Sequence, residues 1–222
     1  MGRAALISLC LLAACSPPAQ ERSAEDETTA VSSEPGQERF YGREQFTMSG
    51  TFTGAETGSF TEHVRDWGRT RAVIKDVRTA SGREHTRVVY SGADIATIDL
   101  ETGEVTLVTN PFYGDVVEAM RGRDGVAFGR EIMQQMGANA TGERGRFAGE
   151  ACEYWEIPQL GSRSCVAVWG GTLYNRTELD DDVVMERTVT ELRMNDAGPD
   201  AAFAYDASAA TRLPGAPGSP PR

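Results

Sequence analysis

Phe46-Thr47-Met48-Ser49-Gly50-Thr51-Phe52 is the stretch that decides the fold class of this 222-residue chain. Phe46, Met48, Gly50 and Phe52 stand at alternate positions, and threonine or serine occupies the positions between them. Successive side chains of a β-strand point to opposite faces of a sheet, so this spacing predicts a strand with one buried face.

Further segments with strand character continue outward from this stretch. They are joined by short connections rich in Gly, Asp and Thr, which are typical of hairpins. The order predicts an antiparallel meander of about 10–11 strands. The other expected strands cover residues 59–67, 70–77, 84–91, 95–100, 104–110, 145–147, 151–157, 162–169, 172–179 and 183–194.

Residues 115–137 interrupt the strand pattern. Apolar residues there fall near helical spacing, and Gly122 and Gly125 divide the segment into two helices. We expect Asp115 to cap the first helix and Gly137 to end the second. The predicted fold is therefore mostly β: a curved antiparallel sheet, or open half-barrel, with this helical insert packed on its concave face.

The amino terminus has the composition of an export signal. The apolar run from Ala4 to Ala14 is shorter than the roughly 20 residues that a membrane span needs. It ends in Leu12-Ala13-Ala14-Cys15, which resembles the lipobox of bacterial lipoproteins. The resemblance implies that Cys15 becomes the first mature residue and carries acyl chains. The alternative is an ordinary secretory signal that is cut near Ala19.

Serine at position 16 resembles the signal for transfer to the outer membrane, so we expect an envelope protein anchored there, on the periplasmic face. Residues 1–14 are the predicted signal peptide. Residues 15–38 comprise the lipidated cysteine and a disordered tether, because they hold too few apolar residues to offset the entropy of folding. Residues 39–205 are expected to form one β-rich domain, and residues 206–222 a disordered tail.

The chain is acidic, with a net charge of −11. Such a surface argues against binding to nucleic acid and against direct attraction to anionic lipids. Attachment to the membrane is therefore expected to depend on the acyl chains of Cys15.

The four cysteines separate into distinct roles. Cys10 leaves with the signal and Cys15 is lipidated, so Cys152 and Cys165 remain in a compartment where disulfides persist. A zinc site is disfavoured because the pair lacks the CxxC spacing and four ligands. If the two cysteines oppose each other in a hairpin, its turn falls at Pro158-Gln159.

No enzyme constellation stands out in the sequence. Both histidines, His63 and His85, lie in predicted strands, and no G-x-S-x-G, free thiol or phosphate-binding loop is found. The acidic residues 178–182 are interpreted as a solvated turn in preference to a calcium loop. We expect no catalytic activity, no cofactor and no metal.

The apolar residues of the strands and of the Met-bearing insert allow two interpretations. They either fill a plain core or line a cleft for an acyl chain, because ligand pockets are mostly apolar and Met adapts to variable partners. The residues expected to line such a cleft are Phe46, Met48, Phe52, Trp67, Met120, Ile132, Met133 and Met136.

A family resemblance rests on short motifs at 58–60, 67–71, 98–100, 109–111, 149–155 and 165–171. With the lipobox and the order of elements, residues 40–194 resemble the LolA/LolB-like lipoprotein-carrier superfamily. The resemblance implies an open half-barrel with helices across its concave face, and an apolar cargo or lipidated partner. The cysteine hairpin and the glycines within the helical insert depart from the carrier pattern.

Two functions remain open at this point. The first is a membrane-anchored, non-enzymatic envelope lipoprotein that binds an acyl chain, a lipoprotein or another apolar ligand in its curved sheet. The second is a structural or protein-interaction lipoprotein of the envelope with a filled core and no ligand.

Overall fold

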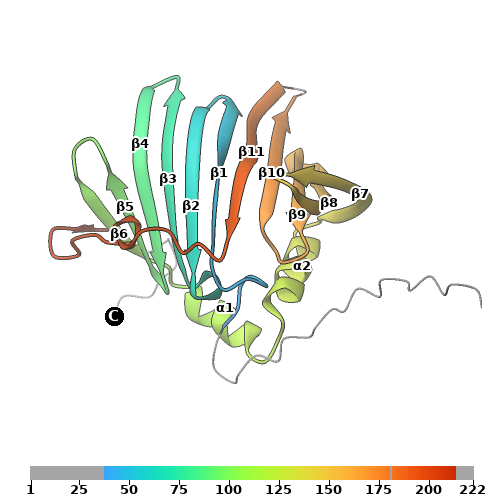
Figure 1. The fold of residues 1–222 in the computed structure, drawn as a ribbon, viewed down its shortest axis with the longest axis horizontal. Coiled ribbons are helices and arrows are strands. Elements are labelled where there is room, and N and C mark those ends of the chain that lie inside the picture. The colour runs from blue at the N-terminus through green and yellow to red at the C-terminus, as the bar shows by residue number, and fades with distance from the viewer. Residues whose placement is uncertain (1–37, 181, 214–222) are drawn as a thin grey trace, which may run out of the picture. The chain divides into compact units, whose positions relative to one another are not determined.

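Twelve strands form one sheet in the order β12-β6-β5-β4-β3-β2-β1-β11-β10-β9-β8-β7. The computed structural model describes residues 38–180 and 182–213 (Figure 1). The predicted signal peptide, Cys15, residues 15–37 of the tether and residues 214–222 of the tail lie outside the described residues. The mostly β fold class is confirmed, with twelve strands where about 10–11 were expected.

The elements follow the predicted order of strands, helical insert and strands. The first group contains β1 (Phe46–Gly54), β2 (Thr57–Arg65), β3 (Thr70–Thr79), β4 (Gly82–Ser91), β5 (Asp94–Asp99) and β6 (Val105–Thr109). The helices are α1 (Tyr113–Met120) and α2 (Gly125–Gln135). The second group contains β7 (Asn139–Phe147), β8 (Glu150–Ile157), β9 (Ser162–Ala167), β10 (Thr172–Leu179), β11 (Asp182–Met194) and β12 (Thr211–Arg212). Short 3-10 helices are η1 (Asp66–Gly68), η2 (Pro158–Leu160) and η3 (Asp200–Ala202).

The alternation in β1 places its apolar side chains on one face, as predicted. Phe46 pairs with Val64 of β2, and Met48 pairs with Glu62. Residues directly opposite each other share a face of the sheet. Phe46, Met48 and Val64 are almost fully buried there, and Phe52 and Phe60 extend the same core.

The opposite face of the first group of strands is covered by the chain after β11. A row of paired residues crosses this face, namely His63, Ala72, Val89, Ala96 and Leu107. Residues 195–210, which we call the C-terminal segment, run across these strands toward β6 (Figure 1). Ala202 is buried against the row, so the C-terminal segment covers this face of the sheet.

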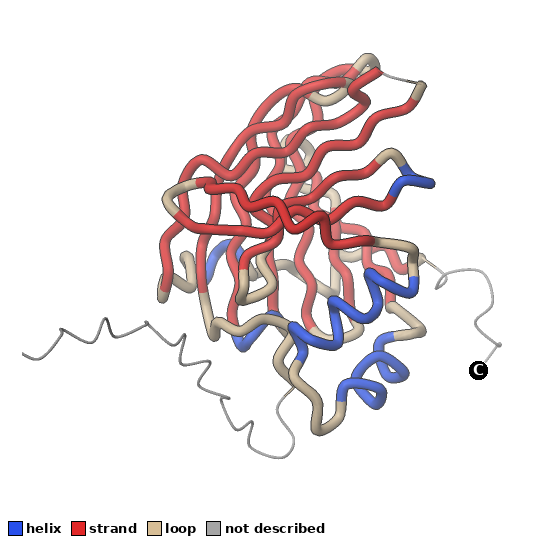
Figure 2. The backbone as a smooth tube through the Cα atoms, turned by 90° about the vertical axis from the view of Figure 1, so that its right-hand side faces the viewer, coloured by secondary structure: helices blue, strands red, loops and turns tan. Residues whose placement is uncertain are grey.

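The sheet curves strongly and leaves two edges, β7 and β12. Figure 2 shows the curved strands, with both helices lying together at one end of them. Met133 of α2 packs against a small cluster of Ala138, Trp155 and Val166. This arrangement confirms the predicted open half-barrel with a helical insert.

The helix ends differ in one respect from the expectation. The N-cap of α1 is Phe112, which makes no side-chain cap, and Asp115 lies within the first turn. The second helix is capped by Asp124, whose carboxylate accepts a hydrogen bond from the backbone N–H of Ala127 at 2.7 Å. Gly137 adopts a φ of 87° just after α2, which confirms its role in ending the helix.

Three segments take structures that the sequence pattern does not indicate. β7 begins at Asn139, six residues before the expected start. The early start was not predicted because the first residues of β7 are polar and show no apolar alternation. Trp67 lies in η1 with a φ of 58°, outside the strand predicted to contain it. Thr211 and Arg212, within the expected disordered tail, pair in parallel with Thr106 and Leu107.

The predicted disulfide between Cys152 and Cys165 is present, with Cα atoms 5.4 Å apart. The expected register was wrong. Cys152 lies opposite Ala167, and Cys165 lies opposite Tyr154. The turn of η2 centres the hairpin one residue later than expected, so the disulfide is diagonal across two strands. Its Cα separation remains within the usual range for a disulfide.

Replacing both cysteines, as Cys152→Ala with Cys165→Ala, is expected to lower the free energy of unfolding by about 3 kcal/mol, because the cross-link restricts the unfolded chain and closes a loop of only moderate length. Urea titration of the oxidised protein and of the variant measures the difference. Dithiothreitol should lower the stability of the parent and leave that of the variant unchanged. An equal response of the two proteins to the reductant would contradict this role.

Candidate functional site

A buried group of charged side chains lies on the face of the sheet that carries Phe46. Glu62 of β2 is only 5% exposed and accepts a hydrogen bond from Arg187 of β11 at 2.9 Å. Arg71 of β3 approaches the same carboxylate at 3.5 Å. Two arginines therefore share one buried carboxylate, and we call Glu62, Arg71 and Arg187 the charge cluster.

Aromatic rings and backbone groups complete the surroundings of the charge cluster. The guanidinium of Arg187 stacks 3.9 Å above the centre of the Phe60 ring and donates to the carbonyl of Thr172 at 2.9 Å. The guanidinium of Arg71 stacks at 4.1 Å on Tyr90. These contacts supply the interactions with π-systems and oxygen atoms that a partly desolvated cation needs.

Burial changes the pKa of groups in and beside the charge cluster. It lowers the pKa of Arg187, although Glu62 acts in the opposite direction. Burial also raises the pKa of the neighbouring Tyr41, and the Glu62 carboxylate adds to that rise. The cluster ties β2, β3 and β11 together in the interior of the curved sheet.

Sequence reasoning missed the charge cluster, although one signal was available. Glu62 follows the same alternation as Phe60 and Val64, so the pattern places its carboxylate on the buried face. Nothing local identifies Arg187 as its partner, because 125 residues separate the two in sequence.

The eight residues expected to line a ligand cleft do not gather around one cavity. Phe46, Met48 and Phe52 are packed within the core, and Met120 is buried elsewhere. The remaining four are spread over η1, α2 and the C-cap of α2. Ile132 and Met136 point into solvent at 37% and 52% exposure, and Trp67 lies under the guanidinium of Arg39; Met133 packs toward the sheet.

The space between α2 and the sheet is small. A cavity of about 130 Å³ lies there, and Met133 is the one residue among the eight that lines it. Ligand pockets usually measure about 300–1,000 Å³, so this space is below the range that a drug-sized ligand fills. Its other lining residues are Phe40, Gly125, Val126, Gly129, Arg130, Val166, Gly170 and Thr172.

A larger cleft of about 530 Å³ lies over β8, β9 and β10. We call it the β8–β10 cleft. Its lining combines aromatic rings with paired charges of both signs, and sequence reasoning did not identify it. The lining residues are Tyr154, Glu156, Pro158, Gly161, Ser162, Arg163, Tyr174, Arg176 and Glu178.

Aromatic stacking and the disulfide fix the walls of the β8–β10 cleft. Tyr154 and Tyr174 stand at 78° to each other with ring centres 6.2 Å apart, and Phe147 stacks on Tyr174 at 5.0 Å. Both tyrosines lie directly opposite Cys165 on neighbouring strands. The disulfide joins β9 to β8, the strand that carries Tyr154, and β10 with Tyr174 pairs with the other side of β9.

The charges of the β8–β10 cleft are already matched within the fold. Arg163 stacks at 4.3 Å on Tyr154 and pairs with Glu156 at 3.4 Å. Arg176 pairs with Glu178. The cleft thus presents rigid rings and oriented ion pairs, with no strong excess of either charge.

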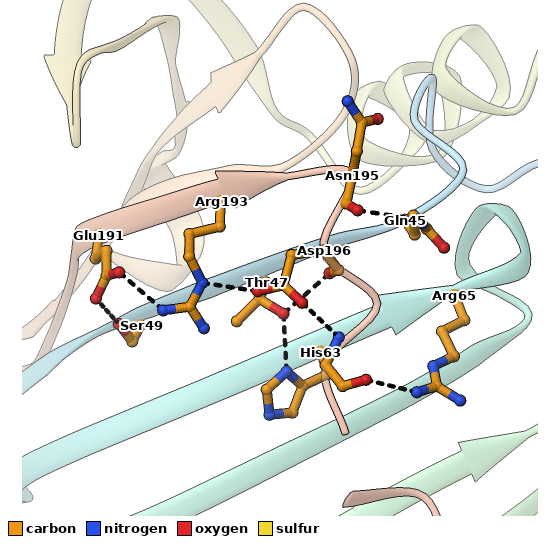
Figure 3. Close-up of polar contacts among 10 residues, drawn as sticks. Gln45, Thr47, Ser49, His63, Arg65, Glu191, Arg193, Asn195 and Asp196 are labelled. Atoms are coloured by element: carbon orange, nitrogen blue, oxygen red, sulfur yellow. Dashed lines mark hydrogen bonds and ion pairs between the residues drawn. The ribbon is translucent and has the colours of Figure 1, made fainter. Parts of the chain in front are cut away.

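His63 anchors the C-terminal segment on the other face of the sheet (Figure 3). Its Nδ1 lies 2.8 Å from the hydroxyl of Thr47, which also donates to the carbonyl of Asp196 at 3.0 Å. Arg65 donates to the carbonyl of Gly198 at 2.6 Å. Burial lowers the pKa of His63, with smaller contributions from Arg193 and Arg65, while Asp196 acts against them.

No metal or membrane-spanning element is found in the described part of the chain. Among residues 38–180 and 182–213, no three His, Cys, Asp or Glu side chains gather closely enough to suggest a metal site. In the same ranges, no helical segment has the length and hydrophobicity that a membrane span requires.

No protein-family model and no curated protein matches this sequence. Its fold is similar to several solved structures. An uncharacterized conserved protein from Thermus thermophilus aligns with a TM-score of 0.49 and 10% identity, over 75% of this chain and 90% of that one. MucB aligns with a TM-score of 0.41 and 13% identity, over 78% and 60% of the two chains.

LprF from Mycobacterium bovis aligns with a TM-score of 0.34 and 12% identity, over 70% of this chain and 85% of that one. A structure of MucB in complex with MucA(peri) also aligns, at 12% identity and a TM-score of 0.43, and this chain spans 56% of it. All these TM-scores are low, so the likeness concerns the general course of the chain and assigns no residue a role.

Removing the carboxylate with Glu62→Gln is expected to cost about 3 kcal/mol of stability, because it leaves Arg187 buried without its counter-ion. Adding Arg187→Met to this variant should recover part of the loss. Urea titrations of the two single variants and the double variant give the coupling energy. Purely additive losses would show that the pair does not act as a unit.

Stability is expected to fall as the pH drops from neutral through the depressed pKa of folded His63. The unfolded chain binds a proton near its ordinary pKa of about 6.5, whereas the buried ring resists it. Urea midpoints at pH 7.5 and 5.5 should differ more for the parent than for His63→Gln. An equal shift in both proteins would assign the pH dependence to other groups.

Proposed function

We propose that this chain is a non-enzymatic lipoprotein of the bacterial cell envelope that binds a protein partner in its β8–β10 cleft. Acyl chains on Cys15 hold it at the outer membrane, on the periplasmic face. The lipobox at residues 12–15 supports the anchor. The confirmed half-barrel with a helical insert is the architecture expected from the resemblance to the lipoprotein-carrier superfamily.

The observation that carries this proposal is the contrast between the two cavities. The space between α2 and the sheet measures about 130 Å³, while the β8–β10 cleft measures about 530 Å³. Phe46, Met48 and Phe52, which would have lined an acyl site, instead pack on one another and on their neighbours. The geometry therefore favours the interaction protein with a filled core over the acyl-chain carrier.

The composition of the β8–β10 cleft suits contact with another protein. Tyrosine and arginine are enriched among the residues that contribute most to protein interfaces, because they combine large apolar area with a polar end. Tyr154 and Tyr174 offer such rings on the two strands that flank β9, and the disulfide joins β9 to the strand of Tyr154. A rigid surface loses little conformational entropy when a partner binds.

The partner's contacts would centre on the aromatic rings. Arg163 and Arg176 already have carboxylate partners, so an added counter-charge gains little from them. The ion pairs instead fix the rim of the cleft and can accept polar groups from the partner. We expect a partner segment that packs an apolar or aromatic side chain against the exposed parts of Tyr154 and Tyr174.

Photo-crosslinking in cells of the source organism tests this function. Benzoylphenylalanine at Tyr154 is expected to capture a discrete protein, and the same residue at Tyr205 on the C-terminal segment serves as the matched control. Adding Tyr174→Ala to the variant with benzoylphenylalanine at position 154 should reduce the capture of this protein. Equal capture at the two positions, or none at Tyr154, would contradict the proposal.

Native mass spectrometry of the protein purified from membranes tests the acyl-carrier alternative. We expect the mass of the lipidated chain with no stoichiometric apolar ligand beyond its own anchor. A co-purifying lipid at one copy per chain, together with failed capture at Tyr154, would favour the carrier function.

A further inference from the structure

The folded domain receives its amino-terminal segment beside the two helices. The first described residues lie against them: the Phe40 ring is 6.4 Å from that of Tyr113 in α1, and the backbone of Arg39 lies close against Gly125 at the start of α2. Arg39 also stacks at 4.1 Å on Trp67. The segment that leads to Cys15 therefore joins the fold at its helical end.

Exposed apolar side chains occur at this same end. Phe112, the N-cap of α1, is 57% exposed, and Val116 lies four residues further along the chain and is 37% exposed. Residues four apart lie on one face of a helix, so these two side chains form a small apolar surface. Single exposed apolar residues are common on protein surfaces. A neighbouring pair beside the point where the amino-terminal segment joins the fold is a stronger indication of a contact surface.

Most charges near this apolar pair are matched within the fold, although Asp115 is an exposed carboxylate between Phe112 and Val116 in the first turn of α1. Arg121 pairs with Glu118 at 2.6 Å, and Arg123 pairs with Glu131. Asp124 is occupied as the cap of α2. Although the whole chain is acidic, the charges that follow α1 are largely matched within the helical end, which reduces repulsion from an anionic bilayer.

We propose that Phe112 and Val116 rest on the bilayer that holds the acyl chains of Cys15. The proposal rests on the anchor assigned under the proposed function and names a second, weaker contact with the same membrane. The occupant is a lipid surface, because residues 16–37 alone separate the anchor from the helical end.

Because the acyl chains already hold the protein at the membrane, a weak contact is sufficient to orient the domain on it. The anchor turns the approach of the helices to the bilayer into an intramolecular event with a high effective concentration. Two apolar side chains, which would not hold a free protein on a membrane, then bias the orientation of an anchored one. The carboxyl end of β10 lies at the opposite end of the sheet from the helices and would be directed away from the bilayer (Figure 1).

The test uses the full lipidated chain in phosphatidylcholine vesicles, with an environment-sensitive dye on Val116→Cys. The matched control carries the dye on Leu179→Cys, because Leu179 is an aliphatic residue with 64% exposure at the end of β10. The other cysteines of the mature chain are acylated or in the disulfide, so each variant offers one thiol. We expect blue-shifted emission and quenching by doxyl lipids at position 116, and neither at position 179.

Phe112→Ser should reduce the signal at position 116 without changing the flotation of the protein with the vesicles. Identical, water-like emission from the two dyes in a floating protein would overturn the docking and leave the anchor intact. A chain that does not float with the vesicles would overturn the anchor and this proposal together. Crosslinking at Tyr154 reports on the partner site separately from both.

Discussion

The pairing of β1 with β2 on one side and β11 on the other is the constraint on which the rest of the structure depends. β1 is the strand that joins the first group of strands to the second. Its register sets Met48 opposite Glu62 and Phe52 opposite Arg187. A slip by one residue would turn the apolar side chains of β1 to the other face and separate Glu62 from Arg187. Burial of the core and pairing of the charge cluster therefore select the same register.

Most elements could be predicted from the sequence because they depend on local patterns. The alternation from Phe46 to Phe52 and the glycines around the helical insert act within a few residues. What escaped prediction depends on distant or irregular contacts. The strand at Thr211–Arg212 exists because the edge of β6 offers it backbone partners, and the left-handed backbone of Trp67 leaves no mark in the alternation. The hairpin between the cysteines was found, but η2 shifted its register.

The candidate site was harder to predict than the fold, for a physical reason. Alternating apolar residues look the same whether their side chains fill the interior or border an empty space. Here they interlock, so Phe46 and Met48 belong to the core, while Ile132 and Met136 face outward. The β8–β10 cleft instead arises where three strands bring Tyr154, Tyr174 and their neighbouring ion pairs together. Such a constellation becomes visible only once the register of the strands is known.

The long-range ladder between β1 and β11 also bears on when the domain can fold. These two strands stand more than 120 residues apart in sequence, so the nascent chain cannot complete its core until nearly the whole domain has been synthesised. Topologies dominated by such non-local contacts fold slowly, because loop closure must precede most of the stabilising interactions. A chain exported as proposed above would therefore remain unfolded while it crosses the inner membrane. Its last long strand would then reach the compartment where the cysteine hairpin can oxidise.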